Sequence, residues 1–137
     1  MSELNTELKK AIDGKAPEVI KLVDELAKKP QYRKPIGSSG GKKGGKRQFT
    51  DLVAAAAQAC CIDEFKLYIK YKAAKEGTRG VWYDLADPFN AKVDDLMKTV
   101  ADEIKQNDET VRLEVLKRFC GYLMWRAHAD IAAQGGG

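Results

Sequence analysis

The chain has 137 residues, of which 24 are basic and 20 acidic, and its net charge is +4. This length suits one domain with a modest core, and a composition that is 44% hydrophobic and 32% charged is typical of a soluble fold. The chain shows no secretory signal, no run near the roughly 18 apolar residues of a membrane span and no Cys-x-x-Cys pair. These features disfavour a membrane protein, a disulfide framework and a zinc site, and predict a cytoplasmic protein.

Residues 1–29 predict two N-terminal helices. The first spans residues 3 to 12 and ends near Gly14, and Pro17 suits the first position of a second helix that Pro30 stops. The second helix carries an apolar stripe at 3.6-residue spacing, made of Val19, Ile20, Leu22, Val23 and Leu26.

Residues 30–47 predict a flexible basic loop, because they contain two prolines, five glycines and two serines. The stretch from 28 to 47 has eight basic residues and no acid, whereas the rest of the chain has 16 basic and 20 acidic residues. The eight are Lys28, Lys29, Arg33, Lys34, Lys42, Lys43, Lys46 and Arg47. Such a local excess indicates a polyanion partner or a solvated tail.

Residues 48–134 predict a helical core. Helical patterns cover QFTDLVAAAAQACC, IDEFKLYIKYKAAKE, a segment from Pro88 to about 105, and residues 109 to 133; VWYDLADP is a short apolar connector. No alternating strand pattern or repeat occurs. We expect an all-α fold, a compact bundle of about five or six helices with a basic Gly-rich loop.

The stretch GGKKGGKR, residues 40–47, nearly matches the phosphate-binding motif Gly-x-x-x-x-Gly-Lys-[Ser/Thr]. Arg47 stands where a hydroxyl should bind Mg²⁺, and the preceding RKPIGSSG does not form the buried strand that this motif follows. A chance match in a Gly- and Lys-rich segment is therefore the better interpretation.

The sequence also gives little indication of a catalytic site. His128 is the one histidine, and Cys120 lies eight residues before it, roughly 12 Å along a helix, too far for a hydrogen bond. Adjacent acids such as Asp94 and Asp95 point about 100° apart on a helix. We expect no enzyme, no metal and no cofactor, with Cys120 in the core and His128 at the surface or an edge.

Cations near aromatic side chains are the remaining signal. One helix carries Tyr68 and Tyr71 among Lys66, Lys70, Lys72, Lys75 and Arg79, and the last helix carries Tyr122 and Trp125 among Arg112, Lys117, Arg118 and Arg126. Such groups bind nucleic-acid backbones and stack on bases, although solvated charges and core aromatics are the simpler interpretation of each helix alone. Together with the basic loop, they favour a contact with phosphates.

The segments RQFTDLVAAAAQACCIDEFKLYIKYKAAKEG and EVLKRFCGYLMWRAHAD resemble the small helical subunit of type III CRISPR effector complexes, in particular those of the III-A and III-D-like branch. The similarity covers residues 47 to 131. It implies a non-catalytic subunit that lines the groove where guide RNA pairs with target RNA, beside further copies of itself and other subunits. By this resemblance the RNA contacts are Lys70, Lys72, Lys75, Arg118 and Arg126.

Charge alone adds Lys42, Lys43, Lys46 and Arg47, and the helical row of cations adds Arg79. Val81-Trp82-Tyr83 is a candidate contact between subunits. Two alternatives stay open: a helical adaptor for protein partners with a basic tether that does not bind RNA, and a small hydrolase or redox protein that uses a cysteine.

Overall fold

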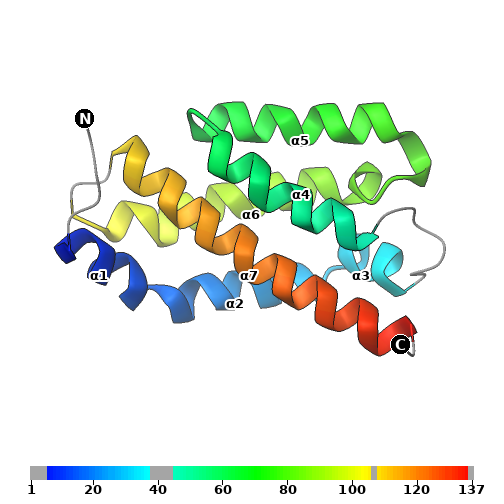
Figure 1. Cartoon of the computed structure of the whole chain (residues 1–137), viewed down its shortest axis with the longest axis horizontal. Helices are drawn as coiled ribbons and strands as arrows, with labels where there is room; N and C mark the ends of the chain where they lie inside the picture. Colours follow the sequence, from blue (N-terminus) through cyan, green and yellow to red (C-terminus); the bar gives the residue numbers. More distant parts are fainter. Residues whose placement is uncertain (1–5, 38–44, 106–107, 136–137) are drawn as a thin grey trace.

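The computed structural model describes residues 6–37, 45–105 and 108–135. Within these ranges the protein is all-α and has no strand (Figure 1). The seven α-helices are α1 (Thr6–Gly14), α2 (Ala16–Ala27), α3 (Pro30–Gly37), α4 (Gly45–Gln58), α5 (Ile62–Glu76), α6 (Trp82–Thr99) and α7 (Glu109–Gly135), and the 3₁₀ helices are η1 (Gly77–Arg79) and η2 (Ala101–Glu103). The all-α expectation is confirmed.

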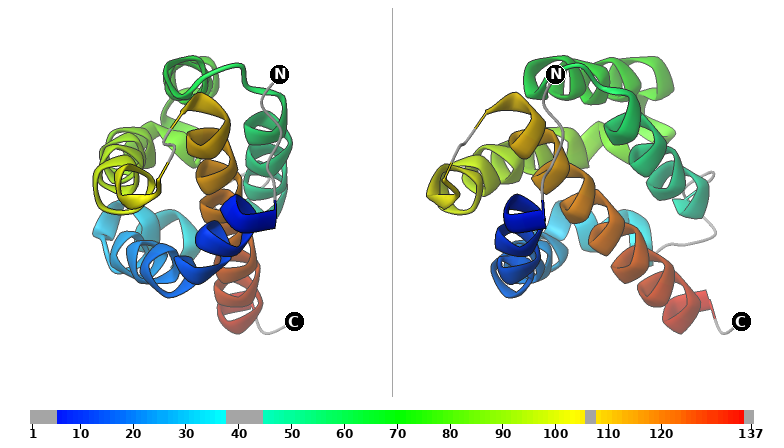
Figure 2. Two further views of the ribbon diagram at one scale, coloured as in Figure 1. Left: turned by 90° about the vertical axis from the view of Figure 1, so that its left-hand side faces the viewer. Right: turned by 60° about the vertical axis from the view of Figure 1, so that its left-hand side comes forward.

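Helix α7 is the centre of the bundle and packs against each of α1 to α6. In the left view of Figure 2, α4 and α6 lie on opposite sides of α7, α5 lies above it, and α2 lies beside its lower half. The inward stripe of α7 is fully buried and consists of Val111, Val115, Leu116, Phe119, Cys120, Leu123 and Ala127. This spacing of three and four residues is the reason that the segment folds as one long helix against a common core.

A chain of ring contacts, here called the aromatic chain, joins five of the helices. Its ring centroids are 6.3 Å apart for Tyr32–Phe49, 5.9 Å for Phe49–Trp82, 5.2 Å for Trp82–Phe89, 6.0 Å for Phe65–Phe89 and 5.8 Å for Phe89–Phe119. The rings come from α3, α4, α6, α5 and α7. All six are buried, so each adds both apolar burial and a favourable tilted or edge contact.

Helix α3 is one helix more than the expected five or six. It lies where the sequence predicts the start of the flexible loop. Tyr32 and Ile36 are buried at i, i+4 spacing, so this segment does have an apolar face. Pro30 stands at the first helical position, where no amide is needed. Pro35 lies in the last turn and leaves the carbonyl of the exposed Gln31 to solvent. The two prolines therefore permit a helix of this length.

Helix α6 also differs from the expectation, since it begins at Trp82 and contains Pro88 instead of starting there. Trp82, Leu85 and Phe89 form one buried stripe at helical spacing. Pro88 has no amide for the carbonyl of Asp84, a residue that keeps partial exposure to water. Burial of the stripe outweighs the loss of that one hydrogen bond.

The start of α6 at Trp82 also shows that the prediction of a contact surface at Val81-Trp82-Tyr83 is wrong. Val81 and Trp82 are buried in the core, and only Tyr83 is exposed.

Among the described helices, none has both the length and the apolar character needed to cross a lipid bilayer.

The aromatic chain predicts a stability effect at Phe49, which contacts rings from both α3 and α6. Phe49→Ala is expected to lower the free energy of unfolding by about 3–5 kcal/mol, because it removes a buried ring and leaves a cavity. Urea denaturation followed by circular dichroism measures this change. Tyr83→Ala is the control, since Tyr83 is exposed, and it should shift stability by about 0.5 kcal/mol or less. Equal effects of the two substitutions would contradict the role given to Phe49.

Candidate nucleic-acid interface

One end of the bundle, here called the basic end, consists of α3, the first turn of α4, the last turn of α5 and η1. Figure 1 shows these segments together at the right of the view. The ring contacts of Phe49 with Tyr32 and with Trp82 fix the start of α4 between α3 and the start of α6. Two residues, Gly80 and Val81, separate η1 from α6. Segments that are far apart in the sequence therefore meet at this end.

The basic end brings together part of the predicted RNA-contact set. Lys46 and Arg47 lie in the first turn of α4, Arg79 lies in η1, and Lys75 lies in the last turn of α5. Lys42 and Lys43 lie outside the described residues, between α3 and α4.

Three cations at this end are exposed and have no acidic partner among the described residues. Arg33, Arg47 and Lys75 form no ion pair with any carboxylate in the described ranges. Arg33 belongs to the predicted basic stretch but not to the predicted RNA contacts. The sequence feature that indicates an exposed Arg33 is its position next to Tyr32. On a short helix with one buried face, the residue after a buried one points toward solvent.

Helix α5 adds an exposed cation–aromatic group. The Nζ of Lys75 lies 5.9 Å from the ring centroid of Tyr71, whose side chain is exposed. Lys70, the next residue before Tyr71, is also exposed. Tyr71 and these two lysines therefore have the chemistry predicted for contacts with phosphates or bases.

Lys72 differs from its neighbours because it is buried. Its Nζ lies 5.7 Å from the ring centroid of Tyr68 and 3.7 Å from a carboxylate oxygen of Glu76. This ammonium group stabilises the packing of α5 and is poorly placed to reach a phosphate outside.

The two predicted arginines of α7 are both paired with two carboxylates. Arg118 contacts Asp13 of α1 and Glu114, and Arg126 contacts Asp24 of α2 and Asp130. These bonds attach α1 and α2 to α7. The structure therefore separates Arg118 and Arg126 from the basic end in both charge and role.

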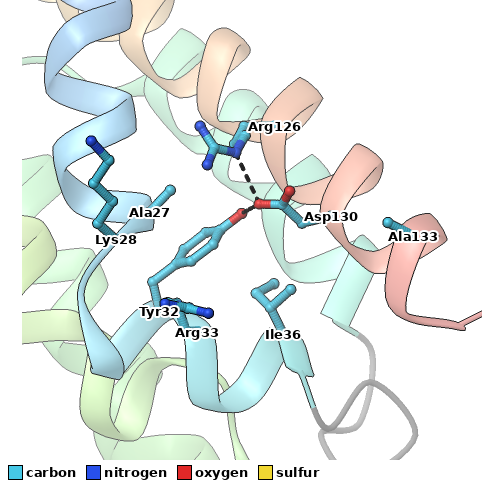
Figure 3. Close-up of a pocket in the computed structure, with 8 residues that line it drawn as sticks. All are labelled: Ala27, Lys28, Tyr32, Arg33, Ile36, Arg126, Asp130 and Ala133. Atoms are coloured by element: carbon cyan, nitrogen blue, oxygen red, sulfur yellow. Dashed lines mark hydrogen bonds and ion pairs between the residues drawn. The ribbon is translucent and has the colours of Figure 1, made fainter.

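Beside Arg126 lies a cavity of about 270 Å³ between α2, α3 and α7, shown in Figure 3. The hydroxyl of Tyr32 donates to Oδ2 of Asp130 at 2.7 Å, and Nε of Arg126 donates to the same oxygen at 3.0 Å. Burial, followed by this bond to Asp130, raises the pKa of Tyr32 well above its usual range. These bonds among Tyr32, Asp130 and Arg126 connect α3 to α7, and Lys28 and Arg33 also line the cavity.

A second cavity, of about 400 Å³, lies between α4 and α5. Its walls include Ala55, Phe65 and Tyr68 together with the carboxylates Asp51 and Glu64. Two acids and no cation make this cavity a poor site for a phosphate.

The catalytic candidates are dispersed. Cys120 is buried as expected, and burial raises the pKa of its thiol. Cys60 and Cys61 are free thiols at the turn before α5, where Sγ of Cys61 accepts a hydrogen bond from the Glu64 amide. His128 is partly exposed, with Nε2 3.4 Å from the hydroxyl of Thr50. Among the described residues, no three His, Cys, Asp or Glu side chains form a group that could bind a metal ion.

No protein-family model, curated protein or solved structure matches this chain.

The network in the first cavity predicts a stability effect of Asp130. Asp130→Ala should lower the free energy of unfolding by about 1–3 kcal/mol, because the buried hydroxyl of Tyr32 loses its acceptor. The matched control is Asp94→Ala, which breaks a surface ion pair with Lys66 and should cost less than about 1 kcal/mol. Urea denaturation compares the two variants. A loss no larger for Asp130→Ala than for Asp94→Ala would contradict the structural role of this network.

Proposed function

We propose that this protein is a non-catalytic small subunit of a type III CRISPR effector complex and contacts the phosphate backbone of guide and target RNA through its basic end. The observation that carries the proposal is a group of three exposed cations, Arg33, Arg47 and Lys75, which pair with no carboxylate of the described residues. Arg33 and Arg47 lie on the two helices that precede and follow the stretch containing Lys42 and Lys43, and Lys75 lies on α5. The sequence resemblance described above supports the same role.

The chemistry of the basic end suits a contact that does not read sequence. Lysine and arginine side chains bind phosphates of any RNA, and in an RNA-guided complex base pairing supplies the specificity. The partners are therefore guide RNA, target RNA and the other subunits, including further copies of this chain. No cofactor takes part in this role.

The geometry favours some members of the predicted set over others. Lys46, Arg47, Lys75 and Arg79 belong to the basic end, and Lys70 lies near it on α5. Lys72, Arg118 and Arg126 are occupied by acids of the same chain. We assign the first group to RNA and the second to the stability of the bundle.

The affinity for RNA should depend strongly on salt concentration. A fluorescent single-stranded RNA should bind with little sequence preference and lose affinity steeply between about 50 and 500 mM salt. Replacing Lys42, Lys43, Lys46 and Arg47 together by glutamine should reduce the slope of log K against log salt, by roughly 0.7 for each lost phosphate contact. Fluorescence anisotropy measures both quantities. RNA binding that does not depend on salt, or an unchanged slope in the variant, would count against the proposal, and negligible RNA binding would favour a protein adaptor.

The second prediction separates the two groups of cations. The double variant Arg118→Gln, Arg126→Gln should keep the salt slope of the unmodified protein and bind RNA within about twofold, because both arginines are already paired. Its circular dichroism spectrum at low temperature verifies the fold. If the double variant reduces the salt slope as much as the fourfold glutamine variant does, Arg118 and Arg126 contact RNA and the assignment to stability is wrong.

A further inference from the structure

The cavity between α2, α3 and α7, here called the α3 cavity, has positive charges that its internal bonds do not balance. Lys28 and Arg33 line it, both are exposed, and neither pairs with a carboxylate in the described ranges. Among the described residues of its walls, Asp130 supplies the one carboxylate, and this group already pairs with Arg126. The charges of Lys28 and Arg33 therefore favour an anionic ligand.

Asp130 also offers an acceptor to such a ligand. The Tyr32 hydroxyl and Nε of Arg126 both donate to its Oδ2, at 2.7 Å and 3.0 Å, and Oδ1 accepts no hydrogen bond from the described residues. The two bonds hold the carboxylate in one orientation. Oδ1 is therefore a fixed acceptor for an N–H or O–H group.

The remainder of the wall is apolar. Ala27 and Ile36 are buried, and Ala133 lies exposed at the rim. Figure 3 shows residues of α3 on one side of the cavity and residues of α7 on the other. The volume of about 270 Å³ is close to the lower limit of roughly 300 Å³ for ligand pockets, so the cavity suits one small group. Such a group is anionic at one end and has an apolar body with a hydrogen-bond donor.

We propose that the α3 cavity binds one nucleotide that carries a terminal phosphate, either as a free nucleotide or at the end of an RNA. The phosphate lies between Lys28 and Arg33, and the base lies over Ile36 with one of its N–H groups donating to Oδ1 of Asp130. A terminal phosphate has a charge of about −1.5 to −2 at neutral pH, whereas a phosphate within a chain has a single negative charge. The two unpaired cations therefore match a terminal phosphate better.

The cavity lies where an RNA end can reach it. Helix α3 belongs to the basic end, and Arg33 is one of the exposed cations there. Every nucleobase has an N–H group on its pairing edge, so the contact with Asp130 does not select one base. Binding of an RNA end rests on the proposed function, whereas binding of a free nucleotide does not.

Isothermal titration calorimetry of the full chain with AMP tests the site. AMP should bind at least about tenfold more tightly than adenosine or inorganic phosphate, because each fragment makes only part of the contacts. Absence of AMP binding at about 5 mM would overturn the proposal. Binding of AMP no tighter than that of inorganic phosphate would also overturn it, since this result indicates a charge contact without a site for the base.

Two variants locate the bound nucleotide. Lys28→Gln combined with Arg33→Gln removes both unpaired cations, and Ala133→Phe fills the cavity from its exposed rim while it keeps every charge. Each should weaken AMP binding at least about tenfold. Circular dichroism and thermal unfolding verify that the variants are folded, as expected for exposed positions. Unchanged AMP affinity in Ala133→Phe would overturn the proposal.

The matched control is Lys10→Gln combined with Lys98→Gln, which removes two exposed lysines on α1 and α6. Figure 1 shows α1 and the end of α6 at the opposite end of the molecule from α3. The control should keep the AMP affinity within about twofold, because distant exposed charges are screened. A loss as large as that of the Lys28 and Arg33 variant would show general attraction to the protein and overturn the site.

An RNA with a phosphate at one end distinguishes the two sources of the nucleotide. Fluorescence anisotropy compares one RNA sequence with a 5′-phosphate, with a 3′-phosphate and with neither. If the RNA end is the ligand, one of the phosphates should raise the affinity at least about threefold, and Ala133→Phe should abolish that gain without weakening the unphosphorylated RNA. Equal affinities of the three RNAs, together with AMP binding as expected, would assign the site to a free nucleotide.

The cavity site and the proposed function fail separately. AMP binding without any RNA binding would support the site and contradict the proposed function. RNA binding that depends on salt, with no AMP binding and no effect of a terminal phosphate, would overturn the site and leave the proposed function standing.

Discussion

The positions of α3 to α7 in this bundle depend on the aromatic chain. Phe49 and Trp82 lie in its middle, and their rings join the start of α4 to the start of α6 while Tyr32 brings α3 to the same place. Ring contacts of this kind add about 0.5–1.5 kcal/mol each beyond apolar burial. The basic end exists because the aromatic chain brings α3, the start of α4 and the start of α6 together. Packing of neutral rings thus determines where the positive charges lie.

Much of the fold could be predicted from apolar spacing. The 3.6-residue period identifies α2, α5 and α7 and places Cys120 in the core, because long amphipathic segments have few alternative structures. The failures lie at α3 and at the start of α6, where prolines suggested loops. Proline raises the cost of a helix locally, but burial of Tyr32 in one case and of Trp82 in the other exceeds that cost. Local sequence does not contain the partners that provide this burial.

The site was predictable in composition but not in geometry. Counting charges identifies the basic stretch and the cations of α5, since these depend on neighbours in the sequence. It does not reveal that Arg118 and Arg126 are neutralised by Asp13 and Asp24, which are about a hundred residues away. Ion pairing between distant segments changes a cation from a binding group into a structural one. Only the folded arrangement separates the two kinds.

The central place of α7 also affects how the chain folds during synthesis. Helix α7 follows the other six in chain order and supplies the surface on which all of them pack. While the ribosome makes α1 to α6, the apolar faces that later pack on α7 stay uncovered, and exposed surface of this kind attracts chaperones or other nascent chains. The bundle therefore closes late, once α7 has emerged.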